Sequence, residues 1–324
     1  MASSPDDQPP LDWGALERLR AAYLGGDTSA DYWRSEGDLR AYDRTFGQRI
    51  AWKWDAVLAD LASLGIAPPA GATVLDFGCG TGVASRRLHA HFPTVGAVRL
   101  HDRSPLARGF AAARLREQEP LLQVAPWDGA ALPRPSVLLA SHVLGELPPR
   151  GEATLFDLAR QADLALFVEP GTHHHSRRLL RLREALRSEL TVIAPCPHGG
   201  PCGLLESTRA RDWCHHFAPP DGIVFHDRGW AEHGRRLGID LRSLPVAHLV
   251  LGRGPPPALP PGRLIGRARL EKGSARLLVC RAEGVTELRL LKRHHPDIHR
   301  RLATFELALR LDDRQLASSI QGGA

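Results

Sequence analysis

The spacing of apolar residues changes twice along the chain. Over residues 11–24 and 39–64, apolar side chains recur every three or four positions, which predicts two helices. From Thr73 onward, short apolar runs alternate with segments of helical spacing, and this alternation predicts a parallel sheet covered by helices. After a first strand that starts at Thr73, the predicted strands cover 95–101, 121–125, 136–141 and 164–169.

The alternation ends after a basic amphipathic segment at 177–190. Residues 191–221 are rich in Pro, Gly, Cys and His, and they are too long and irregular for an ordinary connection. A strand at 246–251, β segments at 263–291 and a helix at 298–310 are predicted to follow. We therefore predict an α/β fold in four parts: a disordered tail (1–10) and helical extension within 1–70, a core at 71–190, a Cys-rich insertion at 191–222, and remaining core strands with a β/α segment at 223–324.

The segment Thr73-Val-Leu-Asp-Phe-Gly-Cys-Gly-Thr-Gly82 carries the first candidate site. Its glycines permit positive φ and let a ligand approach the backbone closely. The dinucleotide pattern G-x-G-x-x-G/A fits badly, because its third position falls on Val83 or Ser85. The arrangement Asp-x-Gly-x-Gly-x-Gly resembles the first motif of Rossmann-like methyltransferases that use S-adenosylmethionine. That resemblance implies that Asp76, Gly78, Gly80 and Gly82 hold the cofactor, with the carboxylate facing its amino group. A glycine turn that binds nothing is the alternative.

Two further acids follow predicted strands. Asp102 comes one strand and one helix after the glycine turn, where a carboxylate can accept hydrogen bonds from ribose hydroxyls. The alternative is a helix cap before Ser104-Pro105. Asp128 follows the third strand, at a place where related enzymes often contact adenine.

Three cysteines fall within nineteen residues of the irregular stretch: Cys196, Cys202 and Cys214. Turn-forming residues separate them, so they are able to converge on one metal, and thiolates select zinc, copper(I) or iron–sulfur clusters. Cys280 is left to complete four, because Cys79 lies in the glycine turn. Spacing alone leaves open a zinc site of three Cys with one further His, or three cysteines with no metal. The candidate histidines are His198, His215 and His216.

The segments Ala194-Pro-Cys-Pro-His-Gly-Gly-Pro-Cys202 and Asp212-Trp-Cys-His-His-Phe217 resemble the signature of a family of methyltransferase-like proteins of the small ribosomal subunit. This family includes a mitochondrial small-subunit assembly factor and bacterial relatives. The resemblance covers roughly residues 40–295. It implies a 4Fe–4S cluster on Cys196, Cys202, Cys214 and Cys280, and binding to small-subunit rRNA. Family members usually carry Asn where this chain has Gly145, which weakens any catalytic claim.

The residues after the predicted fourth strand do not match the motif that amine-methylating enzymes often carry at this place. Amine-methylating RNA and DNA enzymes often carry Asn/Asp-Pro-Pro-aromatic there, and this chain has Ser141-His-Val-Leu144. The nearby acid–base candidates are His142, Glu146 and Glu169, and each is equally suited to hydrogen bonding or capping. No catalytic residue is assigned. The predicted function is an S-adenosylmethionine-binding, methyltransferase-like protein of the small subunit. A methyltransferase on a small molecule or protein, with a structural zinc site, is the alternative.

Charge and composition indicate what kind of partner and which cellular location to expect. Lys and Arg total 42 against 36 Asp and Glu, a formal net charge of +6 that suits a polyanionic partner. Five arginines at 177–190 are candidates to grip phosphates, or to form a solvated helix face. No apolar run approaches the ~20 residues of a membrane span, and the first ten residues lack the features of a secretory signal. We therefore expect a bacterial cytoplasmic protein without disulfides.

Overall fold

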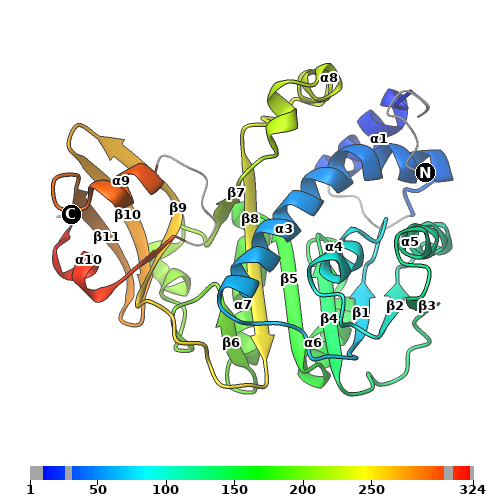
Figure 1. The fold of residues 1–324 in the computed structure, drawn as a ribbon, viewed down its shortest axis with the longest axis horizontal. Coiled ribbons are helices and arrows are strands. Elements are labelled where there is room, and N and C mark those ends of the chain that lie inside the picture. The colour runs from blue at the N-terminus through cyan, green and yellow to red at the C-terminus, as the bar shows by residue number, and fades with distance from the viewer. Residues whose placement is uncertain (1–9, 26–30, 303–308, 322–324) are drawn as a thin grey trace.

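Figure 1 shows the computed structural model, which describes residues 10–25, 31–302 and 309–321. The predicted tail at 1–10, apart from Pro10, lies outside these residues, as does much of the helix predicted at 298–310. In the described part of that segment, α9 (Pro296–Arg301) is earlier than predicted, and a short strand begins at Arg310.

Within the described residues, eight strands form the larger sheet, in the order β3-β2-β1-β4-β5-β8-β6, with β7 pairing beside β8. The five strands β1 to β5 run parallel, whereas β8 is antiparallel to β5, β6 and β7. This topology confirms the predicted α/β Rossmann-like fold. The strands are β1 (Thr73–Phe77), β2 (Ala97–His101), β3 (Gln123–Pro126), β4 (Ser136–Ser141), β5 (Leu164–Pro170), β6 (Thr191–Ala194), β7 (His216–Ala218) and β8 (Leu244–Gly252).

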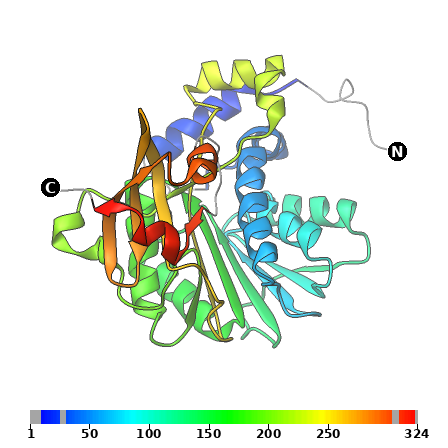
Figure 2. The ribbon, with the colours of Figure 1, turned by 60° about the vertical axis from the view of Figure 1, so that its left-hand side comes forward.

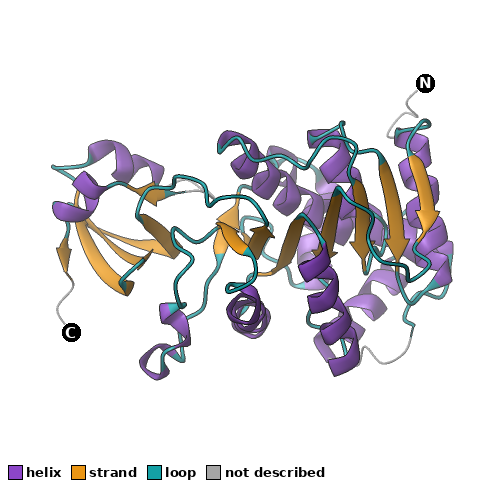
Figure 3. Cartoon of the chain, turned by 90° about the horizontal axis from the view of Figure 1, so that it is seen from below, coloured by secondary structure: helices purple, strands orange, loops and turns teal. Residues whose placement is uncertain are grey.

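Helices cover both faces of the larger sheet because successive residues of each strand face opposite sides. Val74 and Leu139 pack in one core with α3 (Gln48–Ser63), α4 (Val83–His91) and α5 (Pro105–Gln118). Leu75 and Leu138 pack in the other core with α6 (Pro149–Gln161) and α7 (His173–Leu186). Viewed from below in Figure 3, the strands form one row with helices on both sides.

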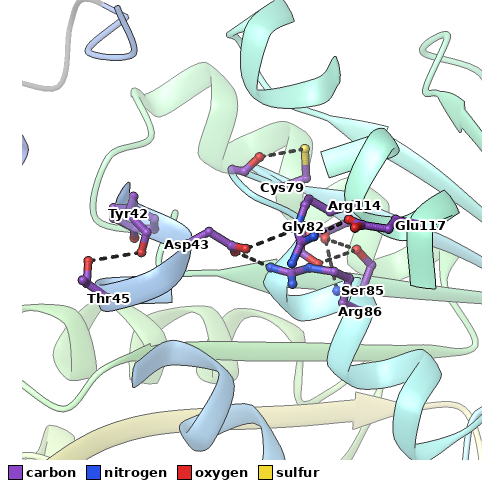
Figure 4. Close-up of polar contacts among 11 residues, drawn as sticks. Tyr42, Asp43, Thr45, Cys79, Gly82, Ser85, Arg86, Arg114 and Glu117 are labelled. Carbon is purple, nitrogen blue, oxygen red and sulfur yellow. Dashed lines mark hydrogen bonds and ion pairs between the residues drawn. The ribbon is translucent and has the colours of Figure 1, made fainter. Parts of the chain in front are cut away.

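A partly buried carboxylate, that of Asp43, attaches the N-terminal extension to this core. The extension consists of α1 (Trp13–Gly25), α2 (Glu36–Tyr42) and a π-helical turn (Asp43–Gly47) that leads into α3. Asp43 forms ion pairs with Arg86 of α4 and, at 3.5 Å, with Arg114 of α5 (Figure 4). Trp54 of α3 is fully buried and donates its indole N–H to Ser141 Oγ at 2.9 Å, at the end of β4. The extension therefore packs directly against the carboxyl ends of the central strands.

A second, antiparallel sheet follows, with the order β12-β9-β10-β11-β13 in the described residues (Figures 1 and 2). Ala275, Leu277 and Leu290 on one face pack against Ile298 of α9 and Leu316 of α10. The other face lies against the Cys-rich segment at its Cys280 end. The elements are β9 (Gly262–Glu271), β10 (Ser274–Arg281), β11 (Gly284–Leu291), β12 (Arg310–Leu311), α10 (Asp313–Ala317) and β13 (Ile320–Gln321), with α8 (Arg228–Leu237) preceding β8.

A buried ionic group joins the second sheet to α3. Both oxygens of Asp60 accept hydrogen bonds from Arg310 of β12, each at 2.8 Å. Arg263 of β9 lies 3.8 Å from the same carboxylate, and its side chain is 2% exposed. Burial opposes the charge of Asp60, yet the hydrogen bonds from Arg310 and the charge of Arg263 hold the pKa of Asp60 below its ordinary value.

Candidate cofactor and metal sites

The carboxyl ends of β1 and β4 form the topological switch point of the larger sheet, since β2 and β3 lie on one side and β5 on the other. Ligands of open α/β sheets bind at such points. Two loops flank it: the glycine loop (78–82) after β1 and the post-β4 loop (142–147). The loops touch closely, because a Cβ on Gly78 would lie 2.4 Å from Val143 Cγ2.

The glycine loop has the backbone that its sequence predicted. Gly78, Gly80 and Gly82 have φ of 76°, 51° and 75°, in the region that favours glycine. A Cβ on Gly82 would meet Ala111 Cβ at 3.0 Å, whereas a Cβ on Gly80 would meet no atom within 4 Å. Packing therefore restricts positions 78 and 82, and position 80 borders open space that a ligand is able to fill.

Asp76, at the end of β1, is fully buried beneath this loop. Its Oδ2 accepts hydrogen bonds from the hydroxyl of Ser85 at 2.8 Å and from the Ser85 N–H at 3.3 Å (Figure 4 shows Ser85 beside the loop). Its Oδ1 is buried and has no hydrogen-bond partner among the described residues. Burial raises the pKa of Asp76 to about 6, against the hydrogen bonds from Ser85.

The two other predicted acids lie at the same edge of the sheet. Asp102 accepts from the Gly80 N–H at 2.9 Å through one oxygen and from the Ser104 N–H at 2.9 Å through the other. It thus braces the glycine loop and also supports the start of α5, where Ser104 is the cap. Asp128, after β3, is exposed and accepts from the Ala130 N–H at 3.0 Å.

The post-β4 loop is held from below by Glu169 of β5. Its Oε1 accepts the N–H groups of Val143 at 3.1 Å and Leu144 at 2.9 Å. Burial raises the pKa of Glu169 to about 8, although these hydrogen bonds oppose the shift. His142 has φ of 55°, and burial lowers its pKa well below the ordinary value, helped by the charge of Lys53. Burial likewise raises the pKa of Glu146 to about 7 and lowers that of Lys53 to about 7.

Glu169→Gln is expected to change how stability depends on pH. Because Glu169 keeps its proton in the folded state up to about pH 8, the unfolded chain releases a proton first as pH rises from about 4.5. Its contribution to stability therefore falls across that window. Glutamine keeps the carbonyl acceptor and does not titrate. The variant should match the wild type near pH 4.5 and exceed it at pH 8, by on the order of a few kcal/mol.

Urea unfolding at pH 5, 6, 7 and 8 measures this difference. Glu117→Gln, at an exposed site on α5, is the control, because it makes the same substitution without removing a buried carboxyl. A pH-independent difference for Glu169→Gln would contradict the assignment of a buried, protonated carboxyl.

The structure brings the four candidate cysteines into one region. Cys202, Cys214 and Cys280 pack in the same apolar cluster, and Cys196 lies in the neighbouring core. Burial raises the pKa of the Cys280 thiol above its usual range, and Cys196, Cys214 and Cys202 raise it further. Thiols from distant parts of the chain therefore lie within electrostatic reach of one another.

A metal-binding geometry is not shown. Over residues 10–25, 31–302 and 309–321, no three His, Cys, Asp or Glu side chains are gathered as ligands of a metal ion. His198 Nε2 lies 3.6 Å from Cys280 Sγ, whereas the ring of His215 stacks on Trp213. A cavity of about 10 Å³, room for one water molecule, is lined by Cys196 and Cys214 among others.

One helix, α7, holds the segments that carry three of these cysteines. Its arginines were candidates for phosphate binding, but the side chain of Arg183 is 1% exposed and donates to the Cys-rich segment instead. The burial of Arg183 could have been read from its position in the helix, because Arg183 lies on the same face as the buried residues Leu179 and Leu186. The contacts are Ser176 Oγ to Cys214 O (2.6 Å), Arg183 Nε to Cys196 Sγ (3.2 Å), Arg183 Nη2 to His198 O (3.0 Å) and Gly200 O (2.9 Å), and Cys202 N to Glu184 Oε1 (3.1 Å).

A sequence model of the family described as mitochondrial small ribosomal subunit Rsm22 matches residues 45–303. This chain belongs to the Rsm22 family. The match confirms the resemblance seen in the cysteine segments and covers the core, the Cys-rich insertion and most of the second sheet of this Rsm22-family chain. None of its described helices is both long and apolar enough to cross a membrane.

Solved structures similar to this Rsm22-family chain include methyltransferases. Magnesium protoporphyrin IX methyltransferase from Synechocystis with bound S-adenosylmethionine has 16% identity and a TM-score of 0.39, covering 76% of this chain and all of that one. Precorrin-6y C5,15-methyltransferase from Geobacter metallireducens has 12% identity and a TM-score of 0.37, covering 60% and 86%. At these TM-scores, the similarity supports no conclusion beyond the fold that the sheet topology already shows. Among curated proteins, no sequence matches the chain.

Proposed function

We propose that this chain binds S-adenosylmethionine and acts on the rRNA of the small ribosomal subunit, in assembly or by methylation. Membership of the Rsm22 family, whose description names the small ribosomal subunit, is the observation that carries the proposal. In a bacterium that partner lies in the cytoplasm, which agrees with the location expected from the sequence.

The residues of the glycine loop fit the proposed cofactor. Asp76 Oδ1 is a buried acceptor with no described partner, which suits the cationic amino group of S-adenosylmethionine. Gly80 borders open space where a side chain would obstruct a ligand. Asp102 and Asp128 would contact ribose and adenine. When bound, the cofactor supplies a methyl group on a sulfonium, and no residue of the chain is assigned to catalysis.

We also propose that Cys196, Cys202, Cys214 and Cys280 hold a structural 4Fe–4S cluster. Four thiols without a carboxylate are the donor set that such clusters use. A zinc ion draws thiolates to about 2.3 Å from one centre, whereas a cluster of four irons is itself larger and leaves its thiolates farther apart. The four thiols lie within electrostatic reach of one another, which supports a shared centre, and iron and sulfide analysis distinguishes the proposed cluster from zinc.

Gly80→Ala is expected to weaken cofactor binding by more than its cost in stability explains. The added methyl enters open space at φ 51°, so it costs the fold about 1–2 kcal/mol but obstructs the proposed ligand. We expect at least a tenfold rise in the Kd for S-adenosylmethionine by calorimetry. Gly238→Ala is the matched control, because Gly238 has φ of 58° and equally open surroundings at the end of α8. Equal effects of both variants on the Kd would refute the site.

Co-sedimentation with purified small ribosomal subunits at moderate salt tests the partner. The protein, purified anaerobically, should sediment with the subunits and contain iron and sulfide. Absence of co-sedimentation, with turnover of a small acceptor and bound zinc, would instead support a methyltransferase of another substrate class.

A further inference from the structure

Three arginines form a row across the second sheet. Arg276 of β10 is directly opposite Arg269 of β9 on one side and Arg289 of β11 on the other. Directly paired residues of an antiparallel sheet share a face, so the three side chains emerge together. The side chains of Arg276 and Arg289 are about half exposed, at 50% and 48%, and Arg269 is exposed too.

Like charges directly opposite one another destabilise a sheet. Glu271 offsets part of this repulsion, 2.7 Å from Arg276 and 3.6 Å from Arg289, and Glu287 lies 4.0 Å from Arg276. Two carboxylates leave the row with a net positive charge. This remaining positive charge on an exposed face suggests a role in binding.

Both exposed lysines of the chain lie at the same end of this sheet. Lysine occurs only at positions 53, 272 and 292, and Lys53 is buried. Lys272 lies in the turn between β9 and β10, and the N–H of Lys292 donates to Gly273 O of that turn at 2.9 Å. In a chain that otherwise uses arginine, this concentration is not explained by composition. We name the five side chains Arg269, Lys272, Arg276, Arg289 and Lys292 the basic surface.

The two faces of the sheet differ in what covers them. Ala275 and Leu290, next to the row, point to the core beneath α9 and α10. The face of the row continues along β10 through Leu278 to Cys280, where the Cys-rich segment covers it. The arginines lie about 13 Å from Cys280 along the strand, beyond this cover. Figure 1 shows β9, β10 and β11 at the end of the molecule opposite β3.

We propose that the basic surface binds the phosphate backbone of rRNA, without reading its sequence. Neighbouring strands lie about 4.8 Å apart, so the three guanidinium groups are spread along one line, as are the phosphates of a nucleic acid strand. The proposal rests on the proposed function, because it assigns a surface to the rRNA partner given there.

The test uses the full-length protein and a fluorescein-labelled RNA hairpin, with the Kd measured by anisotropy between 50 and 200 mM salt. The variant R269Q/R276Q/R289Q should raise the Kd by on the order of tenfold and lower the slope of log Kd against log salt by about 2–3. The control R34Q/R150Q/R228Q removes the same charge from exposed sites on other elements and should change neither quantity. Should the row variant fail to fold, K272Q/K292Q, outside the strands, should lower the slope by about 1–2.

Each other outcome has a definite meaning. If the wild type binds neither the hairpin nor purified small subunits, the proposed function fails. If the wild type binds the hairpin and the row variant binds equally well, the assignment of RNA binding to the basic surface is wrong. The same holds if the control variant weakens binding as much as the row variant does. If polyglutamate competes with the hairpin at equal charge concentration, the surface serves acidic partners in general and the RNA assignment is overturned.

Discussion

Cys280→Ser is expected to leave the protein without most of its iron and sulfide. Cys280 is the cysteine most distant in sequence, on β10, and it links the second sheet to the segment of residues 196–214. Metal binding of this type contributes folding free energy directly. Loss of the proposed cluster should therefore cost several kcal/mol, which corresponds to a fall in Tm on the order of 10 °C.

Iron and sulfide analysis, with visible absorption of the anaerobically purified protein, measures the first effect, and calorimetry measures the second. Cys79→Ser is the control, because Cys79 is buried in the glycine loop and packs in a different core from the other four cysteines. The control should keep its iron. Full iron content in Cys280→Ser would remove Cys280 from the ligand set and with it the proposed cluster.

Asp60→Ala should destabilise the protein by about 3–5 kcal/mol. The substitution leaves Arg310 and Arg263 buried without the carboxylate that contacts both. Asp55→Ala on the same helix is the matched control. Asp55 pairs with Arg87, but its side chain is 30% exposed, and an exposed pair contributes at most about 1 kcal/mol.

Urea unfolding of both variants gives the comparison. The contribution of Asp60 also depends on pH, because its pKa is lowered in the folded state, so the advantage of the wild type should shrink as pH falls below about 4. Equal losses for the two variants would show that the contact between α3 and the second sheet contributes little to stability.

Local pattern predicted the core of the fold well. Strand, acid and three glycines in the segment from Thr73 to Gly82 became β1 and a positive-φ loop, because local sequence dictates such a turn. Position in the sheet was not predictable in the same way. The strand predicted at 246–251 inserts antiparallel between β5 and β6, and pairing partners of distant strands leave no local signal.

The residues proposed for the two sites were selected from the sequence, whereas most of the contacts that hold them in place could not be predicted from it. Cys280 was grouped with three cysteines more than sixty residues earlier by elimination of Cys79 and by the family resemblance, and the fold brings them together. Arg183 was one of five arginines predicted either to grip phosphates or to form a solvated helix face, and neither prediction fits a side chain that is 1% exposed. The pairing of Asp60 with Arg310 joins residues 250 positions apart, a contact that only the assembled tertiary structure reveals.

The positions of its few lysines allow this protein to be labelled selectively at one place. Because Lys53 of α3 is buried, an amine-specific acylating reagent should modify mainly Lys272 and Lys292 among the side chains. A fluorophore or crosslinker attached this way would report from the outer end of the second sheet alone. Shielding of those two amines by a bound molecule would then be readable from intact mass, without any engineered cysteine.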